Sequence, residues 1–336
     1  MYKIVKNKHF DSIFVQTNDI KVELIDYGAT IKQIQSKDHN NQFQDVLLEY
    51  KNEADYLSNA LYLNTTIGPI AGRVRNGEIK TSTKHYQLDK NENNKHALHS
   101  SNLALSHKKF DTKIREAYGE TNVVFSYIET LIDNQTYIIT VTYTIKENQV
   151  KIHHNVHTNF DFFFNLTNHA YFNLSGNLNS DIEDHIVTIH TNKYHKLDTD
   201  LISTHQIVQN TLYDFTEPKR IKSALSQLST KLSKGFDDIY FFPKSHTISK
   251  KATVYEPNSK RALDIYSTYD HMVFYTHNTI SDKPLKHLNT QMKHYGLCFE
   301  CQKSPHNFTH QYASNTYLKA NQDYNDDIIF MFSVME

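Results

Sequence analysis

Alternation of apolar and polar residues recurs from one end of the chain to the other. Val141, Tyr143 and Ile145 alternate with polar side chains, and a second alternation begins at Val150 after the polar run 146–149. A period of two is that of a β-strand with one face buried. The two runs and the polar stretch between them therefore predict a β-hairpin.

Short strand-like runs of this kind continue along the sequence. They include VTIHTNKYHKLD, DDIYFF, ATVYEP, HMVFYTHN and DIIFMFSV, whereas helical periodicity is confined to SALSQLSTKL. Strands do not alternate with long helices, so βαβ units are not expected. The pattern predicts an all-β sandwich with long functional loops. Because no linker, low-complexity tract or short-period repeat interrupts it, we expect a single domain over residues 1–336.

Charge and hydropathy narrow the range of partners. The chain carries 36 basic and 37 acidic side chains, a net charge of −1, and therefore has no long-range field to collect nucleic acid or an anionic membrane. No segment reads as a signal peptide or approaches the ~20 apolar residues of a membrane span. We expect a cytoplasmic protein that binds a small neutral molecule, with neither nucleic acid nor membrane as a partner.

Both cysteines of the chain lie in the segment CFEC, as Cys298 and Cys301. Two thiols are too few for a disulfide framework or a Cys₄ zinc site, and no HExxH pattern is present, so we expect no metal and no cofactor. In a strand, Cys298 and Glu300 share one face and Cys301 occupies the other, which prevents a disulfide between them. A thiol oxidoreductase is thereby disfavoured, and both cysteines read as small buried residues.

Glu300 is the unusual residue of that segment, because its neighbours are apolar. Burial without a partner would raise the pKa of its carboxyl group. Glu300 would have a structural role if its carboxylate faced solvent or paired with a lysine. The alternative is that it lies in a functional site. The segment alone leaves both interpretations open.

Four other segments combine polar and aromatic residues. NLTNHAYFNLSG contains Asn168 and His169, NTTIGPIAGRVRNGEI contains Arg73, NNKHALHSSN contains His96 and His99, and KGFDDIYFF contains Asp237 and Asp238. Buried polar groups need partners, and sugar hydroxyls would serve as well as the protein backbone. Taken singly, each also has an ordinary structural interpretation, as a satisfied core histidine, a surface charge or an Asx turn.

Together these segments resemble the aldose 1-epimerase family. TNHAYFNLSG is close to the family's NHxYFNL motif, LIDYGATIKQIQSKD resembles its N-terminal strand pair, and FECQKSPHNFTH resembles its C-terminal signature. The resemblance implies a large antiparallel β-sandwich and an aldose sugar as substrate, in a monomer or homodimer. By position it implies Glu300 as general base, His169 as general acid, Arg73, His99, Asp237 and Asn278 as sugar-binding residues, and His96 and Asn168 behind them.

The chain departs from the family pattern at several of these places. Ser100-Ser101 replaces a Gly-Gly pair after the histidine, which reduces backbone freedom around His99. Asp238 stands where a histidine is usual, Pro69 replaces an arginine, and Val273 stands where some members have a glutamine. The acid and the base are retained, and the preferred sugar stays open.

The implied reaction sets physical requirements on the site. Interconverting two anomers requires a base for the C1 hydroxyl and an acid for the ring oxygen, which we expect on opposite sides of the sugar. With an ordinary pKa of ~6.5, histidine would hold its proton close to neutral pH. Two alternatives share the fold: an epimerase of hexose phosphates, which needs a cationic grip on phosphate, and a sugar-binding protein without catalysis.

Overall fold

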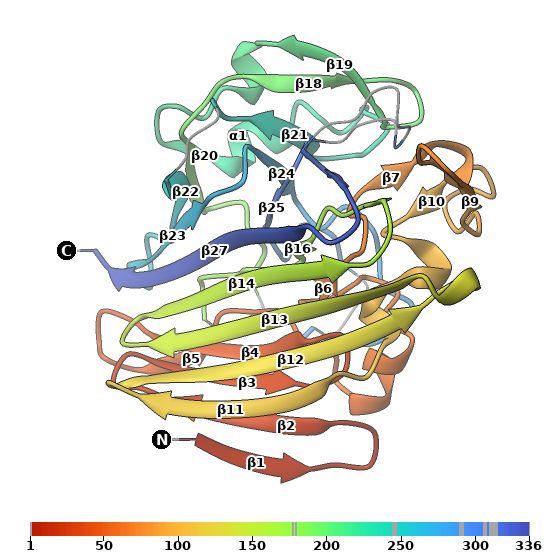
Figure 1. Cartoon of the computed structure of the whole chain (residues 1–336). Helices are drawn as coiled ribbons and strands as arrows, with labels where there is room; N and C mark the ends of the chain where they lie inside the picture. Colours follow the sequence, from red (N-terminus) through yellow and green to blue (C-terminus); the bar gives the residue numbers. More distant parts are fainter. Residues whose placement is uncertain are drawn as a thin grey trace.

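The computed structural model describes residues 2–176, 178, 180–243, 247–288, 292–304, 308 and 315–335. Within them the chain is built from antiparallel sheets, with one short α-helix and brief 3₁₀ turns (Figure 1). The predicted all-β sandwich is therefore confirmed. The end of the FECQKSPHNFTH segment, from Pro305 on, lies largely outside the described residues.

Three large sheets form the body of the molecule. The nine-stranded sheet has the order β11 (Asp111–Ala117), β12 (Glu120–Thr130), β13 (Thr136–Lys146), β14 (Gln149–Thr158), β27 (Asp323–Val334), β23 (Arg261–Ser267), β22 (Ser249–Tyr255), β17 (Ile186–Ile189) and β20 (Lys219–Arg220). An N-terminal sheet has β1 (Tyr2–Lys6), β2 (Asp11–Gln16), β3 (Ile20–Ile25), β4 (Thr30–Lys37) and β5 (Phe43–Asp45). The third sheet, here called the site sheet, has the order β19 (Ser203–Val208), β18 (Tyr194–Leu197), β21 (Asp237–Phe241), β24 (His271–Tyr275) and β25 (Cys298–Gln302).

Smaller elements connect these sheets. The two-stranded pairs are β6 (Thr66–Ile67) with β16 (Thr167–Asn168), β7 (Arg73–Val74) with β10 (Ala97–Leu98), β8 (Glu78–Lys80) with β9 (His85–Gln87), and β15 (Phe162–Phe163) with β26 (Tyr317–Leu318). The helical elements are α1 (Ile221–Leu225), η1 (Glu53–Leu57), η2 (Arg75–Gly77), η3 (Ser101–Leu103), η4 (Leu105–His107), η5 (Ile132–Asn134) and η6 (Thr211–Tyr213).

One hydrophobic cluster runs through all three large sheets. Buried residues of the N-terminal sheet, such as Leu24, belong to the same cluster as Val141 of β13 and Phe274 of the site sheet. In Figure 1 the strands β3, β4 and β5 lie behind β11–β14, with β1 and β2 below β11, and buried residues of the two sheets share this core. Burial of alternate residues explains why the period of two is so clear in the sequence.

The predicted hairpin is confirmed at residue level. Lys146 of β13 pairs with Gln149 of β14, which leaves Glu147 and Asn148 as the turn, and Glu147 adopts a positive φ of 48°. Of the segment SALSQLSTKL only the first three residues lie in the α-helix, since α1 spans Ile221–Leu225.

The arrangement of the CFEC segment is also confirmed. Both cysteines are buried and free, and they pack into different hydrophobic clusters, Cys298 beside Tyr171 and Cys301 in the main core. Burial raises the pKa of the Cys301 thiol to about 12 and that of Cys298 well above its ordinary value. Neither thiol is a thiolate near neutral pH, which argues against redox chemistry.

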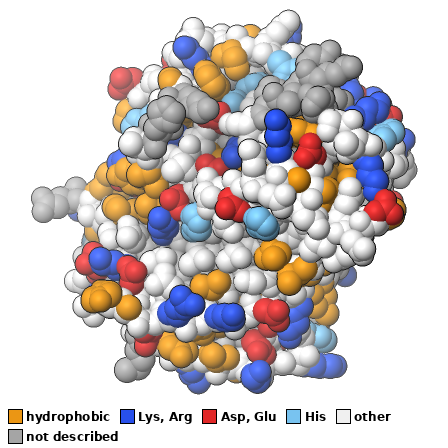
Figure 2. Space-filling model, viewed as in Figure 1, with side chains coloured by type: hydrophobic (Ala, Val, Ile, Leu, Met, Phe, Trp, Pro, Cys, Tyr) orange, Lys and Arg blue, Asp and Glu red, His pale blue; other side chains and the backbone are white. Residues whose placement is uncertain are grey.

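Charged side chains of both signs are interspersed on the face shown in Figure 2, as the net charge of −1 suggests. No helix among the described residues has the length and apolar character needed to cross a membrane.

Arg261, at the start of β23, is the largest buried charged side chain among the described residues. It is 1% exposed, and its guanidinium donates to the carbonyl oxygens of Ser36 and Leu174 and to the side chain of Gln44. Gly176 closes over it, since a Cβ at that position would lie 2.4 Å from Arg261 Nη1. Arg261 thus joins the N-terminal sheet, the nine-stranded sheet and the loop after NLTNHAYFNLSG.

Replacing Arg261 by Met should lower the free energy of unfolding by about 3–5 kcal/mol, because buried carbonyl groups lose their donor. Urea unfolding followed by circular dichroism measures the loss. Arg115→Met on the exposed strand β11 is the matched control and should change stability by less than ~0.5 kcal/mol. Equal losses for the two variants would contradict this role of Arg261.

Candidate functional site

A cavity of about 640 Å³ lies over one face of the site sheet. This volume is within the ~300–1,000 Å³ typical of small-molecule sites. Its floor comes from β21, β24 and β25, and its walls come from loops around residues 60–62, 72–73, 98–99 and 278–280. The cavity brings together Arg73, His99, His169, Asp237, Asn278 and Glu300, which are the predicted catalytic and sugar-binding residues.

Strand register fixes the floor of the cavity. Asp237 of β21 pairs with Tyr275 of β24, and in the next row of the same face Ile239 pairs with Val273, which pairs in turn with Glu300 of β25. Successive side chains alternate between faces, so this row points into the cavity and the core lies on the other face. Glu300 therefore owes its position to β pairing and not to a loop.

Glu300 and His169 are in direct contact. Glu300 Oε1 lies 3.5 Å from His169 Nε2, and the two residues are 3% and 6% exposed. The expectation that acid and base lie on opposite sides of the sugar is wrong, because here they are side by side. Since the C1 hydroxyl and the ring oxygen of a pyranose are both bonded to C1, adjacent groups can reach both.

Aromatic rings hold the imidazole of His169. Its ring stacks on Tyr171 at a centroid distance of 5.0 Å and faces Tyr62 from 6.5 Å. His99 meets it edge-on at 5.4 Å, and His99 itself packs against Tyr62 at 4.6 Å. These contacts restrict the orientation of the imidazole plane.

Burial shifts the two pKa values in opposite directions. It raises the pKa of Glu300 to about 8, with the charge of Asp237 adding to the shift and that of Arg73 opposing it. Burial lowers the pKa of His169 to about 4. The expected histidine with a pKa near 6.5 is thus wrong, because a low-dielectric site penalises the imidazolium.

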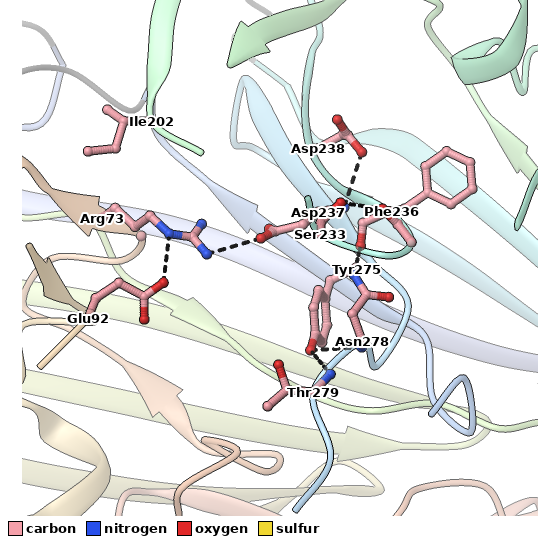
Figure 3. A network of polar contacts seen from close by, with 12 residues as sticks. Arg73, Glu92, Ile202, Ser233, Phe236, Asp237, Asp238, Tyr275, Asn278 and Thr279 are labelled. Atoms are coloured by element: carbon pink, nitrogen blue, oxygen red, sulfur yellow. Dashed lines mark hydrogen bonds and ion pairs between the residues drawn. The ribbon is translucent and has the colours of Figure 1, made fainter. Parts of the chain in front are cut away.

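Arg73 at the cavity forms ion pairs with two carboxylates, those of Glu92 and Asp237 (Figure 3). Arg73 Nη2 donates to Asp237 Oδ2 at 3.2 Å, and Arg73 Nε donates to Glu92 Oε1, also at 3.2 Å. Burial alone would lower the pKa of Arg73, but the two carboxylates outweigh it and raise the pKa. Arg73 is therefore fixed as a cation with a defined orientation.

His99 lies on a turn in which consecutive residues adopt the left-handed conformation without glycine. The φ angles are 50° at His99, 68° at Ser100 and 47° at Ser101. The buried Ser100 hydroxyl donates to the carbonyl of Ile70 at 2.9 Å and accepts its N–H at 2.7 Å. These two hydrogen bonds stabilise a backbone that Ser-Ser would otherwise disfavour.

The remaining predicted residues differ in how close they are to the cavity. Asn278 lines it, but its amide donates to the carbonyl of Phe236 at 2.7 Å and accepts from Thr276. Asn168 is buried behind the cavity, where its amide approaches Tyr143. His96 lies outside the lining, with Nδ1 accepting the backbone N–H of Asn76 and Nε2 3.3 Å from Asp200.

Two of the departures from the family pattern lie away from the cavity and one lies in it. Asp238 is on the opposite face of β21, where burial raises its pKa and Lys231 binds both carboxylate oxygens at 2.8 and 2.7 Å. Pro69 is outside the lining as well, whereas Val273 forms part of the floor beside Glu300.

Sequence reasoning missed several cavity residues. Glu92 comes from a polar loop with no distinguishing pattern, and its role appears only through its contact with Arg73. Gln302 could have been found, because it shares a strand face with Glu300 and belongs to the same segment. Tyr62 carries no pattern that predicts its place beside His169.

Among the described residues, two groups of side chains have the spacing of metal ligands. His99, His169 and Glu300 offer ligand atoms within 4.8 Å of one another, as do Asp45, Glu49 and His287. In the second group the ammonium of Lys286 already pairs with both carboxylates. The first group consists of residues that the resemblance assigns to the sugar site, and the expectation of a metal-free site stays a prediction.

Comparisons with known proteins bear on this site. Residues 11–331 match the family model described as aldose 1-epimerase. The chain is 28% identical to galactose mutarotase of Sus scrofa, covering 95% of the chain and 93% of that protein. It is 25% identical to maltose epimerase of Levilactobacillus brevis, covering 97% and 96%. Galactose 1-epimerase from Lactobacillus acidophilus has the same fold, with a TM-score of 0.84 at 19% identity, covering 100% of the chain and 99% of that structure.

The left-handed turn at His99–Ser101 gives a stability test. Ser100→Ala should lower the free energy of unfolding by about 1–3 kcal/mol, because the N–H and carbonyl of Ile70 lose their partners. Ser101→Ala is the control, because Ser101 also has a left-handed backbone conformation and its substitution removes no hydrogen bond to Ile70. Urea denaturation compares them, and an unchanged midpoint for Ser100→Ala would refute the role of its hydroxyl.

Proposed function

The chain belongs to the aldose 1-epimerase family, a family of isomerases, and we propose that it interconverts the α and β anomers of a free aldohexose such as galactose or glucose. The observation that carries this proposal is the contact between Glu300 and His169, 3.5 Å apart and buried in a cavity that also holds Arg73 and Asp237. The chemistry follows from how these groups can exchange protons with one sugar.

In this mechanism the reaction begins with ring opening. Glu300 removes the proton of the C1 hydroxyl as His169 delivers a proton to the ring oxygen, and the bond between C1 and the ring oxygen breaks. C1 becomes an aldehyde and the ring oxygen becomes a hydroxyl. After rotation about the C1–C2 bond the two transfers reverse on the other face, so both residues regain their starting protonation.

The chemistry requires one proton on the pair before the sugar reacts. With pKa values of about 8 for Glu300 and about 4 for His169, the pair holds one proton across the pH range between them. The two groups titrate as a coupled unit, and transfer of the proton from Glu300 to His169 leaves the pair net neutral. A sugar hydroxyl that donates a hydrogen bond to Glu300 stabilises its carboxylate form. The proton of the pair then resides on His169.

The other cavity residues would hold the sugar. His99 Nδ1 accepts the backbone N–H of Gly72 at 3.2 Å, so its hydrogen is on Nε2 and can be donated to a hydroxyl. Asp237 keeps lone pairs for hydroxyl donors, and the guanidinium of Arg73 is oriented by Glu92 and Asp237. Asn278 has less capacity left, because its amide already serves Phe236 and Thr276.

The two arginines at the cavity suit a free sugar better than a hexose phosphate, whereas the ammonium groups of Lys234 and Lys293 also line the cavity. A phosphate would need an unpaired guanidinium or ammonium group. Arg73 is paired with Glu92 and Asp237, while Arg75 pairs with Asp198 at 2.5 Å and lies 4.0 Å from Asp200. Binding phosphate would therefore compete with existing ion pairs at both arginines.

Glu300→Gln should abolish acceleration of mutarotation, because an amide cannot accept the C1 proton. Loss of a positioned base is worth ~10²–10⁴ in rate. Polarimetry of freshly dissolved α-glucose and α-galactose measures it, with Cys301→Ala as the control on the opposite face of β25. Sugar binding by the intact protein without acceleration would instead support a non-catalytic role.

The pH dependence of kcat/KM should be a plateau between about 4 and about 8 with a fall on each side. Below a pH of about 4 both Glu300 and His169 are protonated, so no base remains. Above a pH of about 8 both are deprotonated, so no acid remains. Polarimetric rates corrected for the spontaneous reaction test this. Full activity well above the upper value would show that the protonated pair is not required.

A further inference from the structure

Beyond Glu300 the cavity contains polar groups that ring opening does not use. Gln302 follows Glu300 by two residues on the same face of β25, about 7 Å further along the strand. It is 1% exposed and lines the cavity, and its Oε1 has no hydrogen-bond partner among the described residues. A buried carbonyl oxygen of this kind normally finds a donor, so a ligand group is its natural partner.

Ser203 lines the same cavity at the first position of β19, where it pairs with Leu197 of β18. Its Oγ lies 2.7 Å from His195 Nδ1, His195 Nε2 lies 3.0 Å from His271 Nε2, and His271 Nδ1 lies 2.8 Å from Asp270 Oδ1. His271 is the register partner of Gln302. Ser203 and Gln302 are thus linked through neighbouring strands at one end of the cavity.

The partners in this chain determine where its hydrogens lie. Burial would raise the pKa of Asp270, but the hydrogen bond that His271 donates is the main contribution that lowers it below its ordinary value, so Asp270 is a carboxylate and an acceptor. His271 must then donate from Nδ1 and, with both imidazoles neutral, accept at Nε2 from His195. His195 Nδ1 in turn accepts from the Ser203 hydroxyl.

Ser203 Oγ has one further contact in this arrangement. It accepts the backbone N–H of His205 at 3.0 Å while its own hydrogen goes to His195. The oxygen therefore has a lone pair, and no hydrogen, left to offer the cavity. Gln302 Oε1 likewise has a free lone pair and no hydrogen. Both atoms can therefore accept a hydrogen bond from a hydroxyl group of a ligand.

We propose that Ser203 and Gln302 form a second recognition site in the cavity, which accepts hydrogen bonds from substrate hydroxyls remote from the anomeric carbon. His195, His271 and Asp270 act as positioning residues that fix Ser203 as an acceptor. This inference rests on the proposed epimerase function. The donor is a hydroxyl either of the reacting hexose or of a second sugar unit in a reducing disaccharide.

The test compares sugars and variants by polarimetry at one fixed pH. Ser203→Ala and Gln302→Met should each raise KM about 3- to 10-fold with little change in kcat, since they remove binding that ground state and transition state share. Thr204→Val is the matched control, because the Thr204 hydroxyl donates to the Lys196 carbonyl at 2.8 Å and lies outside the cavity lining.

Deoxy sugars identify the hydroxyl that is bound. The deoxy series is made from glucose or galactose, whichever the intact protein accepts better. For each sugar, kcat/KM of the intact protein is divided by kcat/KM of Ser203→Ala. This ratio should fall to about one only for the monodeoxy sugar that lacks the bound hydroxyl. A ratio near one for every hexose, with a several-fold ratio for maltose, would place the donor on a second sugar unit. A ratio near one for all hexoses and for maltose overturns the proposal.

The relay has its own test. His271→Leu should raise KM as Ser203→Ala does, and combining the two substitutions should add little, because both remove the same acceptor. Additive losses, or equal losses with Thr204→Val, would show general damage to the sheet and contradict the proposal. If the intact protein accelerates no sugar, the epimerase function itself fails, which this comparison separates from failure of the subsite alone.

Discussion

The burial of Glu300 is the constraint on which the rest of the site depends. A buried carboxylate on the cavity face of β25, in contact with His169, cannot stay charged at ordinary cost. The site responds by retaining a proton, which raises the pKa of Glu300 as the same burial lowers that of His169. A pair with one mobile proton is what an anomer-interconverting enzyme needs, and it requires neither group to be a strong acid or base.

The antiparallel sheet supplies the precision that this chemistry requires. Each row of paired residues across β21, β24 and β25 places a different polar side chain at the cavity: Asp237 in one row, Glu300 beside Val273 in the next, and Gln302 beside His271 in the third. Because β pairing fixes both spacing and face, the distances between these side chains are set by the register. The loops need only close the cavity and bring His169, His99 and Arg73 to it.

Much of the fold could be predicted, because the period of two survives wherever one face of a strand is buried, as at Val141, Tyr143 and Ile145. The shared face of Cys298 and Glu300 followed from the same rule. Properties that depend on distant contacts could not be predicted: the place of Glu92 beside Arg73, the side-by-side arrangement of Glu300 and His169, and the lowered pKa of His169. Each arises from segments brought together only by folding.

The protonation of Glu300 in the sugar-free protein tests this account most directly. Infrared difference spectroscopy between the intact protein and Glu300→Gln isolates the carboxyl band of this residue. The account predicts a protonated carboxyl at neutral pH whose band is lost as the pH rises through about 8. A carboxylate that stays ionised down to the ordinary glutamate pKa of ~4.3 would contradict it.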